Sequence, residues 1–466
     1  MSPIEYFEGA KTIIAAEILA ICIFVGMFLL IILDKFERYY ITLASGALVL
    51  ALVFGVCMHS MSAIWGTLNL PSIFTSGFWY GASEEGNSGI NWSTIFFIAG
   101  MMIMVEGLGK AGFFRWLCLT LAKLVRYRIV PLLVCFMVLS AVLSMFIDSI
   151  TVVLFLATVT LELAQTMKFN PIPMILSEIF CANLGGAATM CGDPPNIIVG
   201  TSLGYTFFDF ISNTGVAVAI CFVLVLIYFV LCFRKRLLRD EKNSGAAVCP
   251  QPGTAITNRP AFLLSAGVFL LAVILLATHA QTKLTVACIG VIVAALSLVV
   301  IGCTSGGKAV LEIIKGVDYK TLLFFIGLFV SVAGLKETGV LDVIARFITT
   351  VSGGNAAIIV VIILWISAVT SAFVDNIPFA ATMIPVVRSI AAASGIDMGV
   401  LAWALSLGTD LGGNATPIGA SANVVGTSVA AKGGYPISWG VYCKYCVGAT
   451  VLVIAVSMGY LFLRYL

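Results

Sequence analysis

Two aspartates, Asp148 and Asp375, each stand in the middle of a long apolar stretch and are followed by a small polar residue, Ser149 or Asn376. Ionisable side chains at membrane depth are costly to bury and usually mark the path of an ion or a substrate. A carboxylate there can bind Na⁺ or accept a proton. The alternative is structural, because each aspartate could cap the helix that follows it. We favour the functional interpretation and predict that all four residues take part in ion coupling.

A second pair of polar motifs, residues 192–196 (GDPPN) and 419–423 (GASAN), interrupts neighbouring apolar stretches. Proline lacks an N–H and glycine permits sharp turns, so each motif frees backbone groups from helical pairing. Freed carbonyls suit a cation, and the N-termini of half-helices suit an anion. We predict substrate contacts from glycines, amides and hydroxyls in and just before these breaks: Gly192, Gly419, Asn196, Asn423, Thr189, Thr416 and Ser421.

The motifs repeat at a constant spacing. Residues 192 and 419, which open the two breaks, are 227 positions apart, and Asp148 and Asp375 have the same separation. The segments 183–189 (NLGGAAT) and 410–416 (DLGGNAT) also match at that offset. The chain therefore holds two copies of one unit, and matched Gly/Pro breaks in two halves of a membrane protein point to the binding site of a transporter.

The two copies differ in their carboxylates. Asp193 lies in the first break, where the second copy has Ala420, and Asp410 corresponds to Asn183. We predict that Asp193 and Asp410 also take part in ion coupling, since asymmetry is expected when one half binds the coupling ion more tightly. Glu178 is a weaker candidate, which we interpret as a solvated residue at a helix end.

Glycines and cysteines near the breaks have competing explanations. Close helix packing explains the glycine pairs at 185–186 and 412–413 as well as a substrate contact does. Cys181 and Cys191 flank the first break, and thiols bind soft arsenic or antimony. Buried cysteines are more often inert packing residues, and we favour that interpretation here.

Composition places the chain in a membrane. Hydrophobic residues make up 61% and charged residues 10%, with a mean hydropathy of +1.12, whereas soluble proteins are roughly half apolar and a quarter charged. We predict an all-α polytopic protein of the cell (inner) membrane, with no nucleic-acid partner because the net charge is only +3. No cofactor is expected beyond bound Na⁺ or H⁺. Phosphate-binding loops are missing from the sequence, so ATP-driven pumping by this chain is not expected.

The apolar pattern predicts the domain organisation. Spans are expected at 12–33, 40–58, 93–108 and 212–233 in the first copy, and at 261–279, 283–302, 321–335 and 438–463 in the second. Between the third and fourth span of each copy, regions 130–167 and 355–394 carry an aspartate at their middle, as expected for a re-entrant helical hairpin. Regions 173–211 and 400–430 carry the breaks, as expected for broken helices. We predict a first inverted repeat at 1–242, a linker at 243–260 and a second inverted repeat at 261–466.

Basic residues support this inverted arrangement. Five crossings per copy put most of the 25 Lys and Arg residues on one side, which the positive-inside rule makes cytoplasmic. Both termini are then outside and residues 234–260 are cytoplasmic, with a flexible Gly- and Pro-containing part at 243–258. The stretches 110–127 and 337–354 are predicted to be interfacial amphipathic helices.

At these motifs the sequence resembles the ion transporter superfamily, and within it the ArsB/NhaD branch of arsenite and antimonite permeases, sodium-proton antiporters and the melanosomal P protein. The resemblance rests on residues 183–199 (NLGGAATMCGDPPNIIV), 374–385 (VDNIPFAATMIP) and 411–425 (LGGNATPIGASANVV). It implies an elevator-type transporter, often a homodimer, whose hairpins and broken helices move against a scaffold. The related sodium-dicarboxylate symporters carry Ser-Asn-Thr at the hairpin tips, where this chain has Asp148-Ser149 and Asp375-Asn376.

We predict an ion-coupled secondary transporter, not an enzyme, that moves a small inorganic substrate such as arsenite or another anion with H⁺ or Na⁺. A Na⁺/H⁺ antiporter and a Na⁺-coupled transporter of di- or tricarboxylates stay open as alternatives. No Lys, Arg or His falls in the predicted site, so a carboxylate substrate would depend on helix dipoles and bound Na⁺. From other classes, an aspartyl protease with Asp148 and Asp375 as its dyad lacks the expected Gly-x-Gly-Asp context, and a passive channel needs no titratable tips.

Overall fold

The computed structural model describes residues 3–33, 35–81, 89–243 and 250–466. Among these residues every regular element is a helix, and one isolated bridge joins Tyr80 to Leu284. Ten helical segments of the described chain are long and apolar enough to cross a membrane. The predicted fold class, an all-α polytopic membrane protein, is confirmed.

The duplication seen in the sequence is also a duplication of helices. The first copy contains α5 (Trp92–Lys110), α6 (Phe113–Leu124), α7 (Ile129–Ser144), α8 (Ser149–Met167), α9 (Ile172–Gly186), α10 (Pro194–Leu203) and α12 (Val216–Asn243). The second copy contains α16 (Tyr319–Glu337), α17 (Val340–Val351), α18 (Ala356–Ser371), α19 (Asn376–Ser394), α20 (Met398–Gly412), α21 (Ser421–Lys432) and α22 (Trp439–Tyr465). From α5 to α8 each helix begins and ends at residues that match its counterpart in the second copy, because the same caps and breaks recur at the same spacing.

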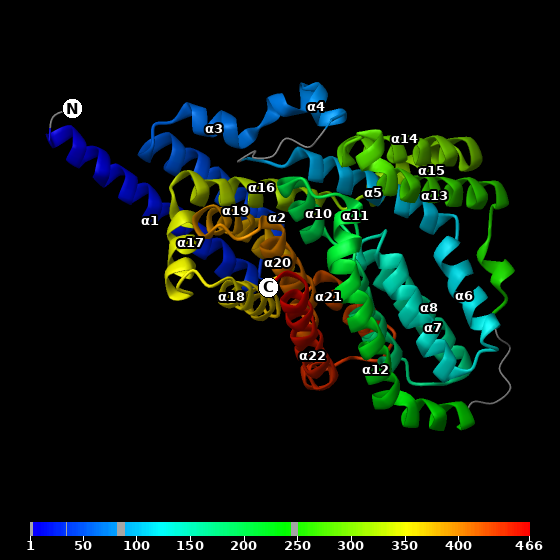
Figure 1. Ribbon diagram of the computed structural model, residues 1–466. Coiled ribbons are helices and arrows are strands. Elements are labelled where there is room, and N and C mark those ends of the chain that lie inside the picture. Colours follow the sequence, from blue (N-terminus) through cyan, green and yellow to red (C-terminus); the bar gives the residue numbers. More distant parts are fainter. Residues whose placement is uncertain (1–2, 34, 82–88, 244–249) are drawn as a thin grey trace.

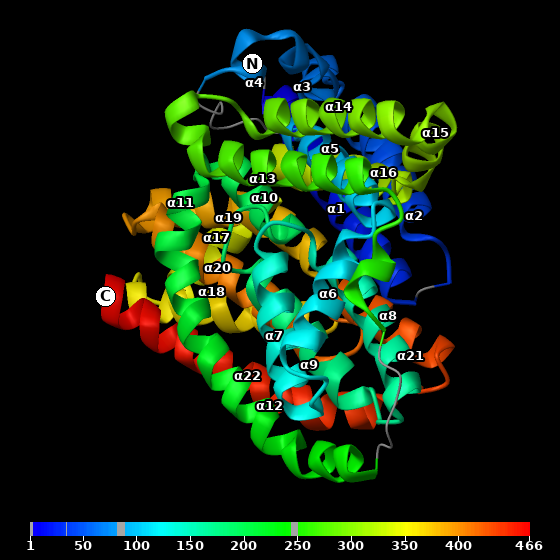
Figure 2. The same cartoon turned by 90° about the vertical axis from the view of Figure 1, so that its right-hand side faces the viewer.

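One layer of the molecule interlocks the two copies. It contains α1 (Pro3–Leu33), α2 (Arg38–Leu48) with its continuation η1 (Val49–Cys57), α5, α13 (Arg259–Thr282), α14 (Val286–Ser305) and α16. Here α5 packs on α14, and α16 packs on α2. A Cβ added at Gly100 would lie 2.2 Å from the carbonyl oxygen of Gly290, so these helices touch backbone to backbone. We call this the scaffold layer; α13, α14 and α5 form its upper edge in Figure 2.

The second layer contains the two hairpins and the two broken helices. Helices α7 and α8 form one hairpin, and α18 and α19 form the other. The second segments of the broken helices cross over, since α21 packs on α8 and α9, and α10 packs on α19 and α20. Helices α12 and α22 pack against each other along this layer, below the scaffold layer in Figure 2. We call it the hairpin layer.

The two copies face opposite ways. Figure 1 places α6, α7 and α8 on the right of the molecule, and α17 and α18 on its left. The short helices α6 and α17 have 12 residues each, too few to cross a bilayer, as expected for interfacial helices. Each hairpin therefore enters from its own end, in agreement with inverted repeats.

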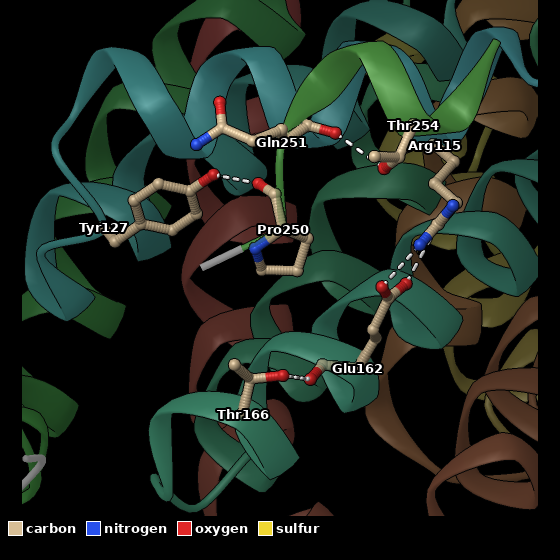
Figure 3. A network of polar contacts seen from close by, with 7 residues as sticks. All are labelled: Arg115, Tyr127, Glu162, Thr166, Pro250, Gln251 and Thr254. Carbon is tan, nitrogen blue, oxygen red and sulfur yellow. Dashed lines mark hydrogen bonds and ion pairs between the residues drawn. The ribbon is translucent and has the colours of Figure 1, made fainter. Parts of the chain in front are cut away.

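Part of the linker is ordered against the first copy, so the prediction of a flexible segment is wrong for residues 250–258. The Tyr127 hydroxyl donates a hydrogen bond to the carbonyl oxygen of Pro250, and Lys123 reaches Gln251 at 3.3 Å (Figure 3). The short helix η4 (Pro252–Ala255) packs on α6, and Ala255 is buried. Nearby, Arg115 forms a bidentate ion pair with Glu162, 2.6 Å at its closest, that ties α6 to α8. Residues 244–249 of the predicted linker lie outside the described residues.

We expect Gly112→Ala to release this linker. Gly112 has a left-handed φ of +85°, and a Cβ there would lie 2.0 Å from the carbonyl oxygen of Ala255. A side chain in this conformation costs about 1–2 kcal/mol before the clash is counted. Limited proteolysis should cut residues 250–258 several-fold faster in this variant, while Gly253→Ala, with nothing within 4 Å of its Cβ, should behave like wild type. Equal cleavage of all three proteins would contradict the docking.

Candidate functional site

Both tip aspartates cap the second arm of their hairpin. Asp148 accepts hydrogen bonds from the backbone N–H and the hydroxyl of Thr151, at 2.9 and 2.7 Å. Asp375 accepts from the N–H of Ile377 at 3.3 Å. The structural alternative considered for these residues is therefore present in the fold. Capping does not test a role in ion coupling, which stays a prediction.

Asp375 makes further contacts that Asp148 lacks among the described residues. Its Oδ2 lies 2.7 Å from Nη1 of Arg38 and also accepts the hydroxyl hydrogen bond of Ser421 at 2.7 Å. Asp375 is buried, whereas about a third of the Arg38 side chain is exposed. Arg38 opens α2 in the scaffold layer, so this ion pair connects the two layers of the molecule.

Arg38 is a site residue that the sequence analysis missed, and its expectation that no basic residue lies in the site is wrong. Arg38 and Asp375 are 337 positions apart in the chain. At the edge of an apolar run, an arginine matches the positive-inside pattern, and that explanation hid a role inside the protein. Only the packing of α16 on α2 brings the start of α2 to the second hairpin.

Asp193 joins the two hairpin tips from behind. Its Oδ1 accepts a hydrogen bond from the hydroxyl of Ser149 at 2.7 Å, and its Oδ2 accepts one from Nδ2 of Asn376 at 2.9 Å. The carboxylate is almost fully buried. Ala420, the counterpart of Asp193, has no such group, so one residue of the first break holds the tips of both copies together.

The amides of the two breaks satisfy the backbone that the breaks release. Nδ2 of Asn196 donates to the carbonyl oxygens of Gly186 and Thr189, at 3.2 and 3.1 Å. Nδ2 of Asn423 donates to the equivalent carbonyls of Gly413 and Thr416, both at 2.8 Å. Both side chains are fully buried.

The threonines and glycines of the breaks attach each broken helix to its own hairpin tip. The hydroxyls of Thr189 and Thr416 donate to the carbonyl oxygens of Met145 and Ala372. A Cβ on Gly192 would lie 2.4 Å from the carbonyl oxygen of Ser144, and one on Gly419 would lie 2.8 Å from that of Ser371. Glycine is required at both positions because the tip backbone passes so close.

A cavity of about 300 Å³ lies between the scaffold layer and the hairpin tips. Of the seven predicted substrate residues, Ser421 borders it, while the other six lie behind its wall. Cys191 also borders it, and Cys181 does not. The charged residues of the wall are Glu37, Arg38, Asp148, Asp318, Lys320 and Asp375. Two of them are basic and four are acidic, so the wall carries an excess of two negative formal charges.

Glu178 is not a solvated helix-end residue, and that interpretation is wrong. The side chain is fully buried, because the hairpin arms enclose every described residue of α9 from Pro173 to Gly186. Its Oε1 accepts a hydrogen bond from the hydroxyl of Thr160 on α8, while Oε2 has no partner among the described residues. Periodicity could not reveal this, because a helix enclosed by its own repeat has no solvent face.

Asp410 lies still deeper, at the meeting point of the two broken helices. It is fully buried, and neither carboxylate oxygen has a hydrogen-bond partner among the described residues. Its counterpart Asn183 is well bonded, since its Nδ2 donates to Oδ1 of Asn423 at 2.8 Å and to Oδ1 of Asn414 at 2.9 Å. The predicted coupling residues are thus divided between the cavity wall, the tip junction and the interior.

The paired hairpins, the matched breaks and the spanning helices define a multi-pass secondary membrane transporter. A family model described as citrate transporter matches residues 28–408. An uncharacterized transporter of Mycobacterium bovis is 32% identical over 451 residues, covering 96% of this chain and 99% of the relative. The chain belongs to the citrate transporter family, in agreement with the superfamily that its motifs resemble.

More distant similarities agree with this assignment. The P protein of Mus musculus is 28% identical and shares 80% of this chain, which spans about half (54%) of that protein. Among solved structures, MtrF of Neisseria gonorrhoeae, described as one of a class of antimetabolite efflux pumps, has a TM-score of 0.56 at 12% identity, covering 85% of this chain and 84% of MtrF. This structural likeness concerns the fold alone.

Proposed function

We propose that this protein is a cation-coupled secondary transporter of a small carboxylate anion, and that Arg38 and Asp375 exchange partners during transport. The observation that carries the proposal is their 2.7 Å ion pair, which joins the scaffold layer to a hairpin tip at the cavity. A cation on Asp375 releases Arg38, and the freed guanidinium then binds the anion. The pair is replaced by two new pairs, one for each transported ion.

The charge of the cavity explains why the anion needs a cation. With an excess of two negative charges on the wall, an anion that enters alone meets net repulsion. Cations bound at Asp375 and at Asp148, the other tip carboxylate on the wall, remove that excess. Coupling follows from this electrostatic requirement, because the anion and the cations each improve the binding of the other.

Breaking the pair also frees the hairpin layer from the scaffold layer. Arg38 and Asp375 belong to different layers, so the unloaded site holds them together with a charge-assisted hydrogen bond. Loading with both ions removes that connection and permits the elevator movement that the family resemblance implies. The cytoplasmic orientation of the cavity and a homodimeric assembly are parts of the same proposal.

A carboxylate fits this site better than arsenite does. Arginine recognises carboxylates with a planar, bidentate geometry. Arsenite at neutral pH is mainly the uncharged acid, which gains little from a guanidinium. The description of the matching family as citrate transporters agrees with this choice, and a cavity of about 300 Å³ is at the small end of the range for ligand sites.

The acidic excess of the cavity also favours the second candidate, a Na⁺/H⁺ antiporter. In that case the cations exchange at Asp375, and Arg38 competes with them without ever binding an anion. The role of Arg38 therefore decides between the two functions.

The test is transport by purified protein in liposomes, with citrate, succinate, arsenite, or Na⁺ and H⁺ alone. We expect cation-driven carboxylate uptake, and an apparent affinity about 30-fold weaker in Arg38→Gln, because a charge-assisted hydrogen bond contributes about 2 kcal/mol. Arg128→Gln removes a charge from an exposed residue outside the cavity and should match wild type. Arsenite transport that is equal in both variants, or Na⁺/H⁺ exchange without any carboxylate uptake, would overturn the proposal.

A further inference from the structure

The two copies place an amide and a carboxyl group in equivalent positions. Asn183 on α9 and Asp410 on α20 are repeat counterparts, as are Asn423 and Asn196 in the breaks. In one pair, Nδ2 of Asn183 donates to Oδ1 of Asn423 at 2.8 Å. In the other pair, Asp410 meets Asn196. The same contact is therefore made once by a donor and once by a residue that has no donor when it is ionised.

The orientation of Asn196 is fixed by the backbone. Its Nδ2 donates both hydrogens to the carbonyl oxygens of Gly186 and Thr189, which can only accept. Its Oδ1 must therefore be the acceptor, and it does accept a hydrogen bond from the hydroxyl of Ser406, one turn before Asp410 on α20. Asn196 has no hydrogen left to offer to a carboxylate.

The surroundings of Asp410 provide no positive charge. The carboxyl group is fully buried, and both of its oxygens lack partners among the described residues. The titratable group that interacts with it is Asp193, just before α10, which is itself acidic. On the neighbouring α9, Glu178 bonds Thr160 of α8 instead. An ionised carboxylate in such a place is strongly unfavourable, whereas a protonated one is a neutral hydrogen-bond donor.

We infer that Asp410 carries a proton, which it donates in a hydrogen bond to Oδ1 of Asn196, and that this carboxyl group is a proton-binding site inside the hairpin layer. The O–H of Asp410 then takes the place of the N–H of Asn183 in the equivalent contact. The remaining Asp410 oxygen is one turn from Nδ2 of Asn414, the donor near it that lacks a partner among the described residues.

Asp193 supplies a route for the proton. It interacts with Asp410 on one side and bonds both hairpin tips on the other, where Asp148 and Asp375 border the cavity. A proton entering from the cavity reaches Asp410 through Asp193. That protonation is independent of the substrate, whereas a role of this proton in coupling rests on the proposed function.

Asp410→Asn tests the inference, since asparagine already occupies the equivalent position 183. Infrared spectra of the purified protein should lose the C=O band of one protonated carboxylic acid, one that shifts on transfer to D₂O. The variant should fold and unfold at a temperature equal to or above that of wild type. In liposomes it should lose uptake driven by a pH gradient, by at least tenfold, and keep substrate exchange.

Asn183→Asp is the matched control, because it removes two donated hydrogen bonds and should lower the unfolding temperature. An unchanged infrared spectrum of Asp410→Asn would overturn the inference. So would failure of this variant to fold, because an existing donor would have been replaced by another donor. Stabilisation of wild type by Na⁺ that disappears in Asp410→Asn would assign the site to a metal ion instead. None of these outcomes affects the Arg38→Gln result, so the two proposals fail separately.

Discussion

Asp375→Asn is expected to uncouple anion binding from the cation while the protein stays folded. In wild type, Arg38 is engaged by Asp375 at 2.7 Å until a cation takes its place. The asparagine variant has no charge to hold Arg38, so the anion should bind equally well with and without the cation. Its affinity without cation should exceed that of wild type about 30-fold, the equivalent of about 2 kcal/mol. Concentrative uptake should be abolished.

The measurement is anion binding by calorimetry at several cation concentrations, followed by uptake into liposomes. Asparagine caps a helix about as well as aspartate does, so the hairpin should not lose stability. Asp397→Asn makes the same change at the exposed cap of α20, away from the cavity, and should leave binding and uptake unchanged. Cation-dependent binding that survives in Asp375→Asn would show that the residue is only a cap.

Gly185→Ala and Gly412→Ala should each destabilise the hairpin layer severely. These counterparts lie where α9 crosses α7 and where α20 crosses α18. A Cβ at Gly185 would lie 2.1 Å from the carbonyl oxygen of Ala141, and one at Gly412 would lie 2.4 Å from that of Ala368. Backbone cannot move aside as a side chain does, so we expect a loss of about 3 kcal/mol at either position, at the upper end for overpacking.

Thermal unfolding in detergent and the yield of folded protein give the readout. Gly267→Ala is the matched control, because Gly267 is an exposed residue inside α13 and nothing lies within 4 Å of its Cβ. It should be neutral or stabilising by up to about 1 kcal/mol, since alanine favours a helix more than glycine does. Normal stability with reduced substrate binding in Gly185→Ala would instead favour a substrate contact, the alternative left open by the sequence.

The sequence by itself determined the architecture of this protein, because its signals are local or periodic. Apolar runs gave the spanning helices, and one constant offset gave two copies whose helices begin and end at matching residues. Asp148 and Asp375 were recognisable as tip residues, since an aspartate before a helix is a cap wherever it occurs. The citrate transporter family confirms the class of transporter that these motifs indicated.

The tertiary structure alone decided which polar groups meet. Arg38 reaches Asp375 across 337 residues, and Asp193 bonds tips that come from both copies. Burial was equally hidden: Glu178 and Asp410 lie in helices whose every side is covered, so no periodicity distinguishes them. Contacts between distant segments depend on how helices cross, and in this protein the crossings are set by glycines at which two backbones touch.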